Sequence, residues 1–149
     1  MKRILLSALA MFLVINIQAQ SPQVTFDHMS LVVKDLSTTI DFYVKVLGFH
    51  RIDDPTGVAT IDWVENQTGQ QLHFSQGDMS EIKFSKSVHM SFGVDALAPF
   101  IANLEKHNIP YESWTGDKSS ITIRADGIRQ IYINDPNGYW IEINDRVTN

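Results

Sequence analysis

The sequence predicts an α+β fold of two tandem βαβββ modules that together form one open mixed β-barrel with helices outside. Three observations support this prediction. The tripeptide His-Met-Ser opens an apolar run at His28 and again at His89, 61 residues later, and a segment of helical period follows each copy. Each half closes with an apolar run after a glycine, Gly69 or Gly138. Clusters of turn-forming residues separate the short runs between them.

The first module is expected at residues 24–76. Residues 24–33 alternate between apolar and polar side chains, as a half-buried strand does. The helix that follows carries one apolar stripe; Asp35 or Ser37 can cap its start, and Gly48 lies where helices commonly end. Three further strands are expected at 49–53, 58–65 and 70–75. The stripe covers the apolar face of the first strand, so the polar alternates point to the opposite face.

The second module is expected at residues 87–145, after a polar linker at 76–86. A strand at 87–94 precedes a helix from about 96 to 107, for which Asn108 is the stop signal. Four short strands follow, at 111–114, 121–124, 128–133 and 139–144, the last two joined as a hairpin.

Residues 1–19 have the layout of a secretory signal peptide. Lys2 and Arg3 precede an apolar run that is shorter than the roughly 20 residues of a membrane span, and Ala19 is a small residue suited to cleavage. We therefore expect an exported protein, periplasmic or secreted, whose mature chain at 20–149 is a single domain without a stable membrane anchor. The alternative is an uncleaved N-terminal anchor.

The composition excludes several classes of function. The chain has 17 acidic and 12 basic residues, a net charge of −5 at pH 7 and no cluster of basic residues, so we expect no nucleic-acid partner. It contains no cysteine, which rules out disulfides, thiolate metal sites and cysteine nucleophiles. The partner that we expect is a small-molecule substrate.

Four side chains with metal-binding capacity occupy matched strand positions, His28 with His73 in the first half and His89 with Glu142 in the second. All four are expected on the face opposite the helices, so they converge if the two halves pack as related copies. Three imidazoles and one carboxylate suit one divalent transition metal: Zn, Fe, Ni, Co or Mn. Octahedral geometry would leave two positions open. The alternative is a hydrogen-bonded polar cluster without a metal.

Longer segments carry a resemblance to a known family. They are Asp27-His28, the run from Ile40 to Phe49, Leu72-His73, the strand around His89, and the run from Asp135 to Glu142. Together they resemble the vicinal oxygen chelate superfamily, the group of glyoxalase I, bleomycin-resistance proteins and extradiol dioxygenases. The resemblance covers almost the whole chain after residue 19. It implies paired βαβββ modules, a divalent metal, and substrates that chelate this metal through adjacent oxygens.

Carried over position by position, the resemblance implies His28, His73, His89 and Glu142 as metal ligands of a lyase, isomerase or ring-cleaving dioxygenase. Glyoxalase I enzymes generally have Glu or Gln where this chain has His73, and that carboxylate helps to move the substrate proton. Glu142 is then the only evident carboxylate at the centre, so it would be both ligand and catalytic base or leave that role to water. Dimers are common among relatives, so we expect a homodimer.

Two other functions remain open. Relatives that sequester drugs resemble this fold but generally lack the ligand set, and Trp63, Trp114 and Trp140 could form an aromatic cleft of the kind that they use. A metal-stabilised structural domain without turnover is the other alternative. Arg124 and Arg129 could bind a substrate carboxylate, although solvated charges on strands are the commoner role for such residues.

Overall fold

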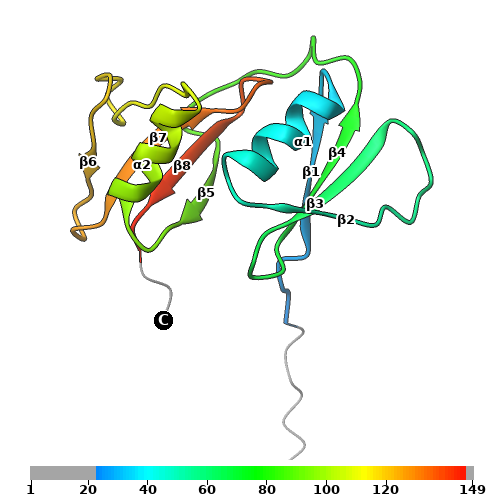
Figure 1. Ribbon diagram of the computed structural model, residues 1–149, viewed down its shortest axis with the longest axis horizontal. Coiled ribbons are helices and arrows are strands. Elements are labelled where there is room, and N and C mark those ends of the chain that lie inside the picture. The colour runs from blue at the N-terminus through cyan, green and yellow to red at the C-terminus, as the bar shows by residue number, and fades with distance from the viewer. Residues whose placement is uncertain (1–22, 147–149) are drawn as a thin grey trace, which may run out of the picture.

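A computed structural model describes residues 23–146 of the 149-residue chain, and the expected signal peptide at residues 1–19 lies outside this range. Two modules of the same βαβββ order follow one another, each with one helix and a four-stranded mixed sheet (Figure 1). The predicted α+β class and the duplicated module are confirmed. None of the helices within residues 23–146 is long and apolar enough to cross a membrane.

The first module contains β1 (His28–Val33), α1 (Leu36–Lys45), β2 (His50–Ile52), β3 (Ile61–Glu65) and β4 (Gln71–Gln76). Its strands have the order β1-β4-β3-β2, in which β1 runs parallel to β4 and the other neighbours are antiparallel. Helix α1 begins where predicted, because the Asp35 carboxylate accepts the Thr38 amide proton over 2.7 Å. The chain turns away at Gly48, whose φ of +75° favours glycine.

The second module contains β5 (His89–Gly93), α2 (Leu97–Lys106), β6 (Thr122–Ile123), β7 (Arg129–Asn134) and β8 (Trp140–Asn144), in the order β5-β8-β7-β6. The predicted strand at 111–114 is wrong, because only Glu112 bridges there, to Lys118 and Tyr132. The Ser113 hydroxyl bonds both the amide and the carboxylate of Asp117, which closes a turn directly after this bridge.

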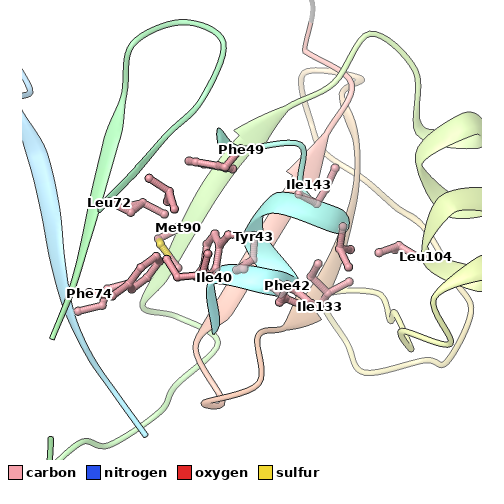
Figure 2. Close-up of a cluster of buried hydrophobic side chains, with 14 of the residues drawn as sticks. Ile40, Phe42, Tyr43, Phe49, Leu72, Phe74, Met90, Leu104, Ile133 and Ile143 are labelled. Atoms are coloured by element: carbon pink, nitrogen blue, oxygen red, sulfur yellow. The ribbon is translucent and has the colours of Figure 1, made fainter. Parts of the chain in front are cut away.

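One hydrophobic core joins the two modules. Helix α1 lies over the first sheet and α2 over the second (Figure 1), and buried side chains of both modules form one cluster (Figure 2). Tyr43 of α1 is fully buried against Phe49 and Phe74. Thr39, also on α1, accepts a hydrogen bond from Asn137 of the second module. Helix α1 therefore contacts both modules.

The two sheets remain separate. Every strand pairing within residues 23–146 joins strands of the same module, and β1 and β5 are edge strands. The open barrel that the sequence predicts is therefore not closed by strand pairing inside the described chain. Its closure would bring the edge of one sheet to the edge of another, which is how barrels remove exposed edges.

Candidate metal centre

The four expected ligands lie as two separate pairs. In the first module the rings of His28 and His73 stack, with centroids 4.0 Å apart and planes inclined by 15°. In the second module His89 Nε2 lies 3.4 Å from Glu142 Oε2. Among the residues that the structure describes, no three histidine, aspartate or glutamate side chains gather into a group that could hold a metal. One chain thus presents two half-sites.

The two half-sites occupy equivalent places in their sheets. A serine two residues after the first histidine of each module pairs across the parallel strands with the second expected ligand, and an aromatic residue of the next strand pairs with that ligand from the other side. In each equivalent pair the residue of the first module is named first: His28 with His89, Ser30 with Ser91, His73 with Glu142, and Trp63 with Tyr132. Because side chains alternate along strands, all eight point to the face opposite the helices.

His28 and His89 are each oriented by a hydrogen bond at one ring nitrogen. His28 Nδ1 lies 2.6 Å from Asp27 Oδ2, and His89 Nδ1 lies 2.7 Å from the carbonyl oxygen of Lys86. Both partners are acceptors, so each Nδ1 carries a proton and each neutral ring keeps its Nε2 lone pair. Metal-bound histidines commonly donate their other N–H to a carboxylate or carbonyl in this way. Both histidines therefore fit ligation through Nε2.

Glu142 is a buried and fully hydrogen-bonded carboxylate. Its Oε1 accepts bonds from Ser91 Oγ at 2.9 Å and Asn144 Nδ2 at 2.8 Å, and its Oε2 accepts the Tyr132 hydroxyl at 2.7 Å. Burial acts to raise the pKa of Glu142, but the three hydrogen bonds and the nearby His89 outweigh it and leave the pKa below its ordinary value. Glu142 is therefore ionised at neutral pH, as a metal ligand must be.

His73 is held differently from the other two histidines. Its ring also stacks on the Trp63 indole, with centroids 3.7 Å apart and planes inclined by 6°. Its Nε2 lies 3.1 Å from Gln71 Oε1, so the neutral ring donates there and keeps the lone pair on Nδ1. Burial, and then the neighbouring His28, lower the pKa of His73. His73 is therefore neutral at pH 7 and offers Nδ1, whereas His28 and His89 offer Nε2.

The residues present fit a divalent transition metal once two complementary half-sites are combined. The donor set then contains three imidazoles and one ionised carboxylate, which suits a borderline metal ion. The hydrogen-bonded Nδ1 atoms of His28 and His89 are the observation that favours this fit over a polar cluster alone, because a ring that donates from Nδ1 can bind a metal through Nε2.

Two contributors to the site are missing from the sequence prediction. Tyr132 donates to Glu142, and it alternates with the buried Ile131 and Ile133, a pattern that placed its side chain on the face of the site. Lys86, whose carbonyl orients His89, lies in the polar linker. No periodic pattern marks a linker residue, so no sequence signal identified it.

Two arginines and the two remaining histidines differ in their position relative to the half-sites. Arg124 Nη1 lies 3.8 Å from Glu142 Oε1, so this guanidinium borders the site. Arg129 pairs with Asp145 at 2.6 Å instead. His50 is 57% exposed and lies 3.4 Å from Glu65, and His107 caps the end of α2. Of these four, only Arg124 forms an ion pair with an expected ligand.

Comparison with known proteins matches residues 25–143 to the sequence model of the Glyoxalase/Bleomycin resistance protein/Dioxygenase superfamily. The uncharacterized protein YwbC of Bacillus subtilis (strain 168) is 30% identical over 126 residues, which covers 80% of this chain and 96% of that protein. Lactoylglutathione lyase of Pseudomonas putida is 24% identical over 153 residues, which covers 81% of this chain and 84% of the lyase.

The fold also has counterparts among solved structures. Oxidase ChaP-H2 aligns with a TM-score of 0.68 at 21% identity, over 85% of this chain and 96% of the oxidase. At this level of identity the likeness shows the fold alone. The family match, in contrast, spans both half-sites, from His28 to Glu142.

Proposed function

The chain belongs to the Glyoxalase/Bleomycin resistance protein/Dioxygenase superfamily, and on this premise we propose that it is a metal-dependent enzyme acting on a small oxygenated substrate. The substrate chelates the metal, and the reaction is of the lyase, isomerase or ring-cleavage type. The proposal rests on the matched half-sites, in which His28 and His89 each donate Nδ1–H to an oxygen, so that Nε2 is the ring nitrogen that would bind the metal.

We propose that the complete site is assembled across a homodimer. The first half-site of one chain would face the second half-site of the other, which joins His28 and His73 to His89 and Glu142. The edge strands support this assembly, because Phe26 before β1 is 65% exposed and Val88 before β5 is 77% exposed. Exposed apolar side chains beside an unpaired strand edge are typical of surfaces that bind another chain.

Each residue of the site has a distinct role in the proposal. A divalent metal, when bound, would act as a Lewis acid on the substrate oxygens. Tyr132, Ser91 and Asn144 hold the Glu142 carboxylate ionised, which suits ligation and weakens it as a proton acceptor, because a low pKa means a weak base. Arg124 lies beside Glu142, where its positive charge would attract an anionic group of the substrate.

A binding protein without turnover is the second candidate. Trp63 forms part of an aromatic stack on the face of the first half-site, and Trp114 is 44% exposed near His89. Such a surface could hold a flat small molecule. This candidate predicts that His28→Ala leaves ligand affinity unchanged, whereas metal-dependent chemistry predicts its loss.

Metal content tests the enzyme proposal directly. The protein purified without chelator should carry about one equivalent of a transition metal per site, and His89→Ala and Glu142→Ala should lose it. His107→Ala is the control and should keep the metal, because His107 lies at the end of α2, on the helix side of the second sheet. Wild-type protein that takes up no metal after loading would refute the proposal. Lactoylglutathione is the first substrate to assay, in view of the Pseudomonas putida relative.

We also propose that the protein is exported. The support comes from the sequence of residues 1–19, in which Lys2 and Arg3 precede an apolar run that ends near the small residue Ala19. An extracytoplasmic site would act on a substrate outside the cytoplasm.

A further inference from the structure

Lys86 lies at the end of the linker between the modules and is firmly held there. Its Nζ lies 2.5 Å from Glu112 Oε1, 3.0 Å from the Ser113 carbonyl oxygen and 3.2 Å from the Trp114 carbonyl oxygen. These three acceptors match the three protons of an ammonium group. The ammonium also lies 4.6 Å from the centre of the Trp140 ring, within cation–π range. A lysine that is only 17% exposed is thus completely satisfied.

Glu112 connects this lysine to the strand beside Glu142. Its side chain is 14% exposed and also contacts Lys118, which is 77% exposed. Its backbone exchanges two hydrogen bonds with Tyr132, at 3.0 Å and 2.9 Å. Glu112 is therefore fixed to the same residue that donates a hydrogen bond to Glu142.

These contacts close a ring around the second half-site. The Lys86 carbonyl oxygen accepts a hydrogen bond from His89 Nδ1–H, and the Lys86 ammonium binds the Glu112 carboxylate. The Glu112 backbone pairs with that of Tyr132, and the Tyr132 hydroxyl donates to Glu142 Oε2. Glu142 Oε2 in turn lies 3.4 Å from His89 Nε2. Both expected ligands of the second module are thus oriented by one Lys86–Glu112 pair.

In the first half-site, His28 has no equivalent buried support among the described residues. His28 Nδ1 binds Asp27, the preceding residue, whose side chain is 90% exposed, and His28 itself is 39% exposed. The His89 side chain is 23% exposed and that of Glu142 is 7% exposed. The second half-site is therefore pre-organised by buried contacts to a greater degree than the first.

We propose that Lys86 and Glu112 are positioning residues, which fix the linker so that the Lys86 carbonyl holds His89 with Nε2 beside the Glu142 carboxylate, where both would bind the metal. This inference rests on the proposed function for the metal, but the orientation of the His89 ring is a property of the metal-free chain. The pair does not touch the metal or the substrate. It acts through His89 and Tyr132.

The test compares Lys86→Met and Glu112→Gln, which remove the ion pair but keep side-chain length, with Lys118→Met. Lys118→Met is the matched control, because it removes the exposed partner of Glu112 and leaves Lys86 in place. The first readout is the ring nitrogen NMR spectrum of metal-free protein, with His89 assigned by loss of its signals in His89→Ala. The second is Zn²⁺ affinity, measured by competition with a chromophoric chelator.

We expect wild-type and Lys118→Met protein to show His89 protonated at Nδ1 and to bind Zn²⁺ equally. In Lys86→Met and Glu112→Gln, the His89 signals should change to a mixture of tautomers, and Zn²⁺ affinity should fall by about 10-fold or more, as for other outer contacts of metal ligands. Unchanged His28 signals would show that the fold is intact.

An unchanged His89 spectrum in both variants would overturn the inference, as would a wild-type ring protonated at Nε2. If wild-type protein binds no Zn²⁺, the proposed function fails, while the His89 spectrum still decides the positioning role. The two failures are therefore distinguishable.

Discussion

Replacing Tyr132 with phenylalanine removes one hydroxyl from the centre of the second half-site. That hydroxyl donates to Glu142 Oε2 at 2.7 Å and accepts from Gln130 Nε2 at 2.6 Å. Its loss removes a hydrogen bond to a charged group, about 1.5–3 kcal/mol, and strands a buried amide donor, about 1–3 kcal/mol. Gln130 Oε1 already has no partner in the described structure, so Tyr132→Phe would leave both polar atoms of this amide without the hydrogen bonds that the described residues supply.

The two losses belong to one network and do not simply add, so we expect Tyr132→Phe to lower the free energy of unfolding by about 2–4 kcal/mol. Urea denaturation of metal-free protein at pH 7 and fixed protein concentration measures this value, as a midpoint lower by about 1–2 M. Tyr139→Phe is the control. Its hydroxyl donates to the neutral Val32 carbonyl at 2.9 Å, so we expect a cost of about 1 kcal/mol.

The pH dependence provides a second measurement. The pKa of folded Glu142 lies below its ordinary value of 4.5, so the folded state binds fewer protons than the unfolded state in acid, and the stability from Glu142 is lost as pH falls through that folded pKa. The Tyr132 hydrogen bond contributes to this lowered pKa, so the difference between wild type and Tyr132→Phe should shrink on acidification. A cost below about 1 kcal/mol at pH 7, or one that is equal at pH 7 and about pH 3, would refute this reasoning.

Three further predictions concern the hydrophobic core, the proposed homodimer and the signal peptide. Leu104→Ala should lower the free energy of unfolding by about 2–5 kcal/mol in urea denaturation, because Leu104 is fully buried. Val58→Ala, at a half-exposed site, should change it by no more than about 0.5 kcal/mol, and equal losses in the two variants would contradict the described core. Val88→Lys should convert the proposed homodimer to monomer in analytical ultracentrifugation, because it places a charge beside the β5 edge, and a variant that remains dimeric would argue against this interface. The exported protein should begin at Gln20 by mass spectrometry, and an intact Met1 on the exported chain would contradict cleavage after Ala19.

The sequence by itself determined the module and the faces of its strands. Alternation put His28, His73, His89 and Glu142 on the polar side of their strands, and the cap at Asp35 and the stop at Asn108 marked helix boundaries, because these signals depend on neighbouring residues. The strand expected at 111–114 failed for a similar local reason. The turn between Ser113 and Asp117 competes with strand pairing there, and the alternation did not reveal it.

Only the tertiary structure decided which of those side chains meet. It divided the four expected ligands into two half-sites, because the sheets share a core through α1 but no strand pairing. It also brought Lys86 of the linker to Glu112 and His89, and Tyr132 to Glu142. Such contacts join segments through packing in three dimensions, and a periodic pattern along one strand carries information only about the face on which a residue lies, not about its partner.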